Sequence, residues 1–163
     1  MAKTVRVRVK RVAIDPEKRC LVTVGTLKRD LPIWIGPGEG QAIALVLQGK
    51  ALARPMTHDL FVNALAELGW KIDKLVIADL RECTFYGELH VSSGRKRKVL
   101  DCRPSDGMAL AVRVKAPIYV AEHVLEQALA PPPTVTQEPV VMEVPAEPTR
   151  VKRSGRKSRP TSA

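Results

Sequence analysis

The sequence has too few cysteines for a disulfide framework and no apolar run long enough to span a membrane. Its 163 residues include three cysteines, an odd number without a Cys-x-x-Cys pair, which also disfavours a cysteine-based zinc site. A membrane span needs about 18 apolar residues in a row. The N-terminus lacks the apolar segment of a secretory signal peptide. These absences predict a cytoplasmic protein without membrane contact.

Aromatic residues and negative charge are also scarce. Aromatics make up 4% and hydrophobic residues 45% of the chain, which predicts a core built mainly from Val, Leu, Ile and Ala. The formal net charge is +10, of which residues 131–163 carry +3 and residues 1–130 carry +7. This excess predicts an anionic partner such as nucleic acid. A basic surface that only maintains solubility explains the charge equally well.

The last part of the chain has a composition that cannot form a core. Residues 131–163 are rich in proline and show no helical or strand period. We therefore predict one domain at residues 1–130 and a disordered tail at residues 131–163. The last fourteen residues carry six cations and no acid, which favours transient contact with nucleic acid. A plain solubilising tail is the alternative.

Hydrophobic periodicity predicts an α+β fold. Residues 4–14 alternate valines with cations, as in a half-buried strand. Arg6, Arg8 and Lys10 on its polar face suit contact with a phosphate backbone, although a solvated face is the commoner explanation. Further extended segments are predicted at 19–26, 31–35, 74–80, 85–92, 98–102 and 116–120. Helices are predicted from Pro37 to a stop at Gly49, from Thr57 to a stop at Gly69, at 104–114 and at 121–129.

Two of the predicted strand-to-helix junctions resemble each other. Residues 37–45 align without gaps with residues 104–112, and the proline, the acidic residue, the glycine and both alanines coincide. The order of elements is also three strands and two helices, twice. We therefore predict a duplicated βββαα plan whose two halves pack as one core.

Four blocks of the sequence, spread over about residues 4–129, resemble the bifunctional nuclease (BFN) domain family. They are residues 32–36 with Glu39, residues 54–60, residues 79–80 with 84–86, and residues 101–106 with 116–120. The resemblance implies duplicated βββαα repeats that form one mixed, barrel-like sheet with packed helices, and nuclease activity toward DNA and RNA. Gly40 and Gly107 stand where the family commonly has alanine, and each weakens a helix start by about 0.5–1 kcal/mol.

Phosphodiester hydrolysis needs an activated water and stabilisation of negative charge, which enzymes commonly provide with Mg²⁺ or Mn²⁺ held by carboxylates. The predicted metal ligands are Asp101, Asp106, Glu39 and Asp59. The predicted catalytic residues are Asp101, Asp106, Arg103 as a phosphate clamp and His58 as general base. The predicted substrate-binding residues are Arg54, Arg6, Arg8 and Lys10.

These residues also have structural explanations. Acids in the first turn of a helix stabilise it by about 0.3–1 kcal/mol through the helix dipole. Asp101 and Arg103 suit a structural ion pair, and His58 suits an exposed surface position. We place the site at the second junction because it combines three charged residues, whereas the first has only Glu39. The alternative function is a non-catalytic regulatory module that binds nucleic acid or a small anion. The sequence leaves open whether the protein assembles as a homodimer.

Overall fold

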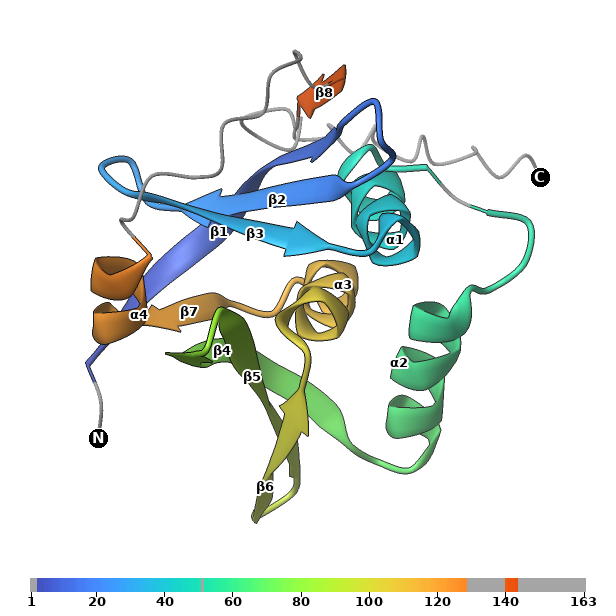
Figure 1. The fold of residues 1–163 in the computed structure, drawn as a ribbon. Coiled ribbons are helices and arrows are strands. Elements are labelled where there is room, and N and C mark those ends of the chain that lie inside the picture. Colours follow the sequence, from blue (N-terminus) through green and yellow to red (C-terminus); the bar gives the residue numbers. More distant parts are fainter. Residues whose placement is uncertain (1–2, 51, 129–139, 144–163) are drawn as a thin grey trace, which may run out of the picture.

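The computed structural model describes residues 3–50, 52–128 and 140–143, and the α+β class is confirmed there (Figure 1). Predicted and observed element ends differ by no more than three residues. In chain order the elements are β1 (Thr4–Ile14), β2 (Cys20–Gly25), β3 (Asp30–Ile35), α1 (Pro37–Leu47), α2 (Thr57–Glu67), β4 (Lys71–Arg81), β5 (Thr84–Ser93), β6 (Lys96–Cys102), α3 (Pro104–Val114), β7 (Ile118–Ala121), α4 (Glu122–Gln127) and β8 (Val140–Glu143).

The strands form one mixed, open sheet in the order β3-β2-β1-β7-β4-β5-β6, with β8 also paired to β1. Only β4 and β7 run parallel; the other paired strands are antiparallel. The barrel-like closure that we predicted is wrong, because β3 and β6 remain separate edges. Helices α1 and α3 pack against each other, α1 against β1 and β2, and α3 against β4 and β5. These helices bury the sheet's apolar face, so the sheet does not need to close on itself.

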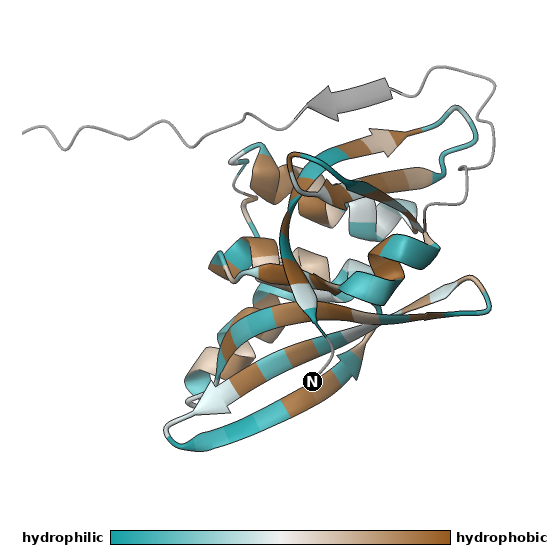
Figure 2. Ribbon diagram, turned by 90° about the vertical axis from the view of Figure 1, so that its left-hand side faces the viewer, coloured by the Kyte–Doolittle hydropathy of each residue, from teal (hydrophilic) through white to brown (hydrophobic). Residues whose placement is uncertain are grey.

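Strand β1 joins the two halves of the sheet. Residues 4–7 pair with β7, whereas β2 pairs with β1 from Arg8 to Ile14, with a register shift around Lys10. Val7 and Val9 are buried, and Arg6 and Arg8 are exposed, which confirms the predicted half-buried strand. Figure 2 shows the matching alternation of apolar and polar bands along the strands.

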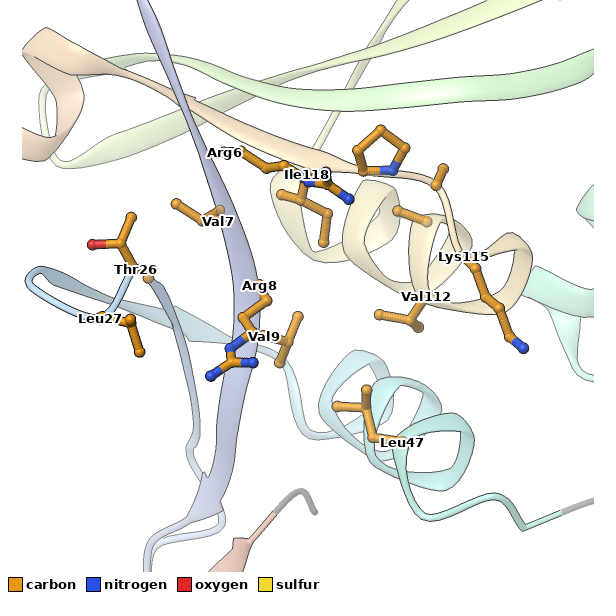
Figure 3. Close-up of a pocket in the computed structure, with 14 residues that line it drawn as sticks. Arg6, Val7, Arg8, Val9, Thr26, Leu27, Leu47, Val112, Lys115 and Ile118 are labelled. Carbon is orange, nitrogen blue, oxygen red and sulfur yellow. The ribbon is translucent and has the colours of Figure 1, made fainter. Parts of the chain in front are cut away.

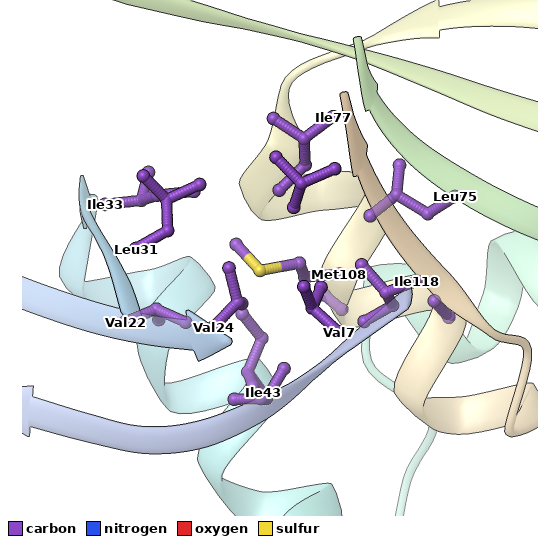
Figure 4. Close-up of a cluster of buried hydrophobic side chains, with 14 of the residues drawn as sticks. Val7, Val22, Val24, Leu31, Ile33, Ile43, Leu75, Ile77, Met108 and Ile118 are labelled. Carbon is purple, nitrogen blue, oxygen red and sulfur yellow. The ribbon is translucent and has the colours of Figure 1, made fainter. Parts of the chain in front are cut away.

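The core lies between the sheet and the helices. Met108 of α3 is fully buried, and Figure 4 shows it among side chains from both halves of the sheet and from α1. The labelled neighbours in that cluster are Val7, Val22, Val24, Leu31, Ile33, Ile43, Leu75, Ile77 and Ile118. A cluster of buried side chains shared by both halves of the sheet therefore holds the α1–α3 pair in place.

The two predicted repeats share local geometry but not the full plan. Gly36 before α1 and Arg103 before α3 both have extended backbone angles, and a proline follows each. The element order, however, is βββαα and then βββαβα, because β7 separates α3 from α4. The duplication stays a prediction.

Two glycines allow the starts of α1 and α3 to pack closely on the sheet. A Cβ on Gly40 would overlap Cys20 Sγ, and a Cβ on Gly107 would overlap Leu75 Cδ1. Both neighbours are fully buried. Glycine at these two positions weakens the helix starts, as inferred from the sequence. It also lets the helices approach the sheet more closely than alanine would allow.

The predicted tail at residues 131–163 is described only at residues 140–143, where strand β8 pairs with residues 11–14 of β1. The rest of that prediction, including the basic last fourteen residues, lies outside the described residues. The division into residues 1–130 and 131–163 stays a prediction.

Candidate functional site

Arg103 links the starts of α1 and α3. Its Nε donates a hydrogen bond to Asp106 Oδ2 at 2.7 Å, and its Nη2 donates to Asp106 Oδ1 at 3.1 Å and to Glu39 Oε1 at 2.7 Å. Each carboxylate lies in the first turn of its helix, where the helix dipole favours negative charge. The two junctions that resemble each other in sequence are therefore joined by one guanidinium.

Arg103 stays accessible although it contacts two carboxylates. The hydrogen bond to Asp106, followed by the charges of Asp106 and Glu39, raises the pKa of the Arg103 guanidinium above its usual value. Its side chain is nevertheless 68% exposed, whereas that of Glu39 is 20% exposed. A phosphate can therefore approach the open side of the guanidinium.

His58 approaches the same cluster from α2. Its Nε2 lies 3.6 Å from Asp106 Oδ1, beyond a direct hydrogen bond, and its side chain is 17% exposed. Asp106 thus lies between Arg103 and His58. The structure therefore brings together His58 and Asp106, two of the predicted catalytic residues.

Asp101 faces the same region through a pocket of about 340 Å³ between α2, α3 and β6. Asp101, Asp106 and His58 line it, together with Cys102 and several apolar side chains. Within the described residues the Asp101 side chain has no hydrogen bond or ion pair, so the suggested pair with Arg103 is not formed there. Its carboxylate is available in the pocket.

Cys102 is a poor nucleophile despite its place in this pocket. Burial, with added effects of the charges of Asp101 and Asp106, raises the pKa of its thiol to about 11. The thiol therefore stays protonated near neutral pH, and the thiolate is the reactive form. The chemistry of the site rests on its carboxylates, imidazole and guanidinium.

A second pocket, of about 400 Å³, borders Arg103 on the side of β3 and the β4–β5 turn. Trp34 and Phe85 line it with Arg103 and Ser105. Trp34 is 37% exposed, and the Arg19 guanidinium lies 5.3 Å from the centre of its ring. An exposed aromatic surface therefore adjoins the cation at the centre of the site, a feature that the sequence reasoning missed.

Asp59 belongs to a different cluster. Its Oδ1 accepts a hydrogen bond from Arg113 Nε at 2.6 Å, and its Oδ2 accepts one from the backbone of Met56 at 2.8 Å. The Arg113 side chain is 6% exposed, and its Nη1 also donates to the carbonyls of Ala42 and Ala109. Arg113 therefore ties α1, α2 and α3 together, and the role we predicted for Asp59 in a shared metal site does not agree with its position.

Burial alone would raise the pKa of Asp59. The hydrogen bonds from Arg113 and Met56, with the charges of Arg113 and His58, outweigh it and lower the pKa below the usual value. Sequence reasoning missed Arg113, because a cation in the last turn of a helix normally indicates an exposed dipole partner.

The four predicted substrate-binding cations lie apart from Arg103. Arg54 lines a pocket with Asp59 and Arg113. Lys10 forms an ion pair with Asp30. Arg6 and Arg8 line a cavity at the C-terminal ends of α1 and α3, whereas Arg103 lies at their N-terminal ends. None of the four lines either pocket next to Arg103.

The predicted metal ligands do not form one set. Within the described residues no group of three or more His, Cys, Asp or Glu side chains is arranged to hold a metal ion. Glu39 and Asp106 contact Arg103, and Asp59 contacts Arg113. Mg²⁺ is often bound by one or two carboxylates plus substrate phosphates. Of the predicted ligands, Asp101 and Asp106 fit that arrangement, because they line one pocket.

The described helices include none that is long and apolar enough to cross a membrane. Comparison with known proteins adds a family match and two relatives. The family model described as the bifunctional nuclease domain matches residues 20–132, which is more than half of the chain.

The two relatives are from Mycobacterium tuberculosis: uncharacterized protein MT1877 of strain CDC 1551 / Oshkosh and uncharacterized protein Rv1829 of strain ATCC 25618 / H37Rv. Each is 49% identical over 100 residues, which cover 61% of this chain. The chain spans 59% of the length of these curated relatives. The family match begins at Cys20, so β1 with Arg6 and Arg8 lies outside it.

Proposed function

The chain belongs to the bifunctional nuclease domain family, and from this premise we propose that it is a nuclease that hydrolyses phosphodiester bonds of DNA and RNA at the junction around Arg103. The observation that carries the proposal is the position of Asp106. Its carboxylate holds Arg103 on one side and faces His58 on the other, at the edge of a pocket that also contains Asp101.

Arg103 is the residue that binds the scissile phosphate in this proposal. Within the described residues the guanidinium donates through Nε and Nη2, which leaves Nη1 for a phosphate oxygen. Charge-assisted hydrogen bonds from arginine to phosphate are short and directional. Glu39 and Asp106 hold the guanidinium in one orientation, so the phosphate meets a positioned donor.

His58 is the general base. A water oxygen attacks phosphorus, His58 accepts the proton of that water, and the bond from phosphorus to the leaving oxygen breaks. The leaving oxygen takes a proton from solvent. Asp106 lies 3.6 Å from His58 Nε2, so its negative charge faces the positive charge that the imidazole gains when it accepts the proton. Asp101 and Asp106 are the pair that would hold Mg²⁺ or Mn²⁺, which when bound supplies Lewis-acid stabilisation of the phosphate oxygens.

Activity on both DNA and RNA follows from the kinds of contact available. The aromatic side chains of Trp34 and Phe85 offer surfaces for stacking a base, worth about 1–3 kcal/mol per base. Stacking on a base and binding of a phosphate do not read the 2′-hydroxyl, which distinguishes RNA from DNA. Stacking also requires an unpaired base, so we expect single strands to be cut faster than duplexes.

The test is cleavage of single-stranded DNA and RNA by the full chain, with Mg²⁺ or Mn²⁺ and with EDTA. Asp106→Asn and His58→Gln should each lower the cleavage rate about 100-fold or more. Binding of the same oligonucleotides should change only a few-fold. Glu122→Gln is the matched control, because Glu122 also lies in the first turn of a helix and pairs with one exposed cation, Lys3.

Two results would overturn this proposal. One is cleavage by Asp106→Asn and His58→Gln at the wild-type rate. The other is a wild-type protein that binds oligonucleotides without cutting them under any of these conditions. The second result would favour the alternative function, a non-catalytic module that binds nucleic acid.

A further inference from the structure

A cavity of about 530 Å³ lies at the C-terminal ends of α1 and α3, the opposite ends from Arg103. Figure 3 shows Arg6 and Arg8 on β1, Lys115 just beyond α3, and Leu47 on α1 around this cavity. Its volume falls in the range of pockets that enclose small organic ligands, roughly 300–1,000 Å³. The cavity is therefore a candidate ligand site separate from the Arg103 junction.

The charge around this cavity is positive and unpaired. Arg6, Arg8 and Lys115 line it, and none of its lining residues is Asp or Glu. Within the described part of the chain these three cations form no ion pair. Lys10, on the same strand, pairs with Asp30 instead. A cavity lined by three cations that lack carboxylate partners favours an anionic ligand.

Lys115 has an unusual backbone conformation for a side chain at a helix end. It adopts the left-handed region, with φ 56° and ψ 31°, directly after α3. Helices α1 and α2 end with glycines in that region, Gly49 at φ 65° and Gly69 at φ 72°. Glycine adopts this conformation without the steric penalty that lysine carries. The left-handed conformation thus occurs at a lysine that lines the edge of the cavity.

The cavity also has an apolar wall. Leu47 and Val112 contribute from the two helices, and Leu27, which is 91% exposed, contributes from the β2–β3 turn. A polyanionic backbone would need only the cations. The combination of cations and apolar side chains in one lining indicates a ligand with phosphate groups and an organic part.

We propose that this cavity binds a nucleotide as a free small molecule, with its phosphates on Arg6, Arg8 and Lys115 and its nucleoside part against Leu47 and Leu27. The proposal does not depend on the nuclease proposal, because the residues differ and Arg6 and Arg8 lie outside the family match. The shared helices α1 and α3 run between this cavity and the Arg103 junction. Ligand binding at one end is thus separable by mutation from chemistry at the other.

Calorimetric titration of the full chain with AMP, ADP and ATP tests the proposal. We expect one nucleotide per chain and affinity that rises with the number of phosphates. Lys115→Gly should weaken ATP binding about tenfold or more, the value for a lost charge-assisted contact. It should not lower the midpoint of thermal unfolding, because glycine relieves the left-handed strain.

Lys18→Gly is the matched control. Lys18 is also left-handed, with φ 62°, and does not line the cavity, so this variant should bind ATP as wild type does. Asp106→Asn should also retain ATP binding, which distinguishes failure of this proposal from failure of the nuclease proposal.

Three results would overturn the proposal. They are no heat of binding with any of the three nucleotides, wild-type ATP affinity in Lys115→Gly, and a Lys115→Gly variant that loses affinity only for a DNA oligonucleotide. The last result would assign the cavity to the path of a nucleic-acid strand.

Discussion

The two ends of the α1–α3 helix pair carry opposite arrangements of charge. At the N-terminal ends, Arg103 is satisfied by Glu39 and Asp106. At the C-terminal ends, Arg8 and Lys115 lie beside a cavity without a carboxylate in its lining. Each helix has 11 residues and is about 16 Å long, so the two arrangements are well separated.

This difference shows that pairing, not the number of cations, decides what a basic residue can do. A phosphate that reaches Arg103 meets a donor held in place by two acids, which favours precise positioning and limits binding strength. A phosphate that reaches Lys115 displaces no carboxylate, which favours affinity. The arrangement around Arg103 suits a reaction at a phosphate group, and the arrangement around Lys115 suits binding of a phosphate group.

The largest expected effect comes from replacing Arg113, a buried cation that is paired with Asp59. Arg113→Met should lower the free energy of unfolding by about 3 kcal/mol, because it leaves Asp59 and two carbonyls without their shared partner. Urea unfolding measures this change. Arg8→Met removes an unpaired cation and should change stability by less than about 0.5 kcal/mol. Equal losses in the two variants would contradict the distinction between paired and unpaired cations.

Arginine-to-lysine substitutions should separate positioning from simple charge. Arg103→Lys removes the fork that contacts both carboxylates, and we expect cleavage of single-stranded DNA to fall about 100-fold, equivalent to about 2.7 kcal/mol. Arg8→Lys keeps the charge at the cavity and should change ATP affinity only a few-fold. An Arg103→Lys variant with wild-type cleavage would show that geometry at this end is unimportant.

At the start of α3, a glycine-to-alanine substitution should destabilise the protein, although this substitution normally stabilises a helix. Gly107→Ala should lower stability by about 2 kcal/mol, because its Cβ would overlap the buried side chain of Leu75. Gly38→Ala in α1 is the control, since no heavy atom lies within 4 Å of the position that its Cβ would take, and it should stabilise by about 0.5–1 kcal/mol. Thermal unfolding of both variants should give shifts of opposite sign.

The end of α3 should behave in the opposite way. Lys115→Gly should raise the free energy of unfolding by about 1 kcal/mol, because it removes a left-handed lysine. Urea unfolding without nucleotide measures the gain. A loss of stability would mean that the Lys115 side chain supports the fold rather than the ligand.

The smallest effect should appear as a pH dependence of the Asp59–Arg113 pair. The pKa of Asp59 is lower in the folded protein than its ordinary value of 3.8. The contribution of the Asp59–Arg113 pair to the free energy of unfolding is therefore complete above about pH 4. It is lost as the pH falls through the pKa that Asp59 has in the folded protein. Urea unfolding between pH 5 and pH 2 should show a shallower acid loss for Asp59→Asn than for wild type. Identical slopes would contradict the assignment.

Local features of this fold could be predicted from the sequence. The alternation of residues 4–14 predicts β1, and the prolines at 37 and 104 predict the helix starts. The same reasoning placed Asp106 and His58 in one site, and their side chains approach to 3.6 Å. Such patterns are readable because strand alternation and helix starts depend on residues close together in the chain.

Long-range arrangements could not be predicted in this way. The open sheet, the contact of Arg103 with Glu39 and the buried ties of Arg113 join segments far apart in the sequence. Of the predicted metal ligands, Glu39 and Asp106 contact Arg103, and Asp59 contacts Arg113. The packing of the helices places these carboxylates next to guanidinium groups instead of next to one another.

The sequence by itself determined the family, the α+β class and the positions of most helices and strands, since all of these follow from local residue patterns. The tertiary structure decided which charges meet. The physical reason is the burial of one core between the sheet and the helices, which sets α1 against α3. That packing pairs Arg103 with carboxylates at one end and leaves Arg6, Arg8 and Lys115 around a cavity at the other.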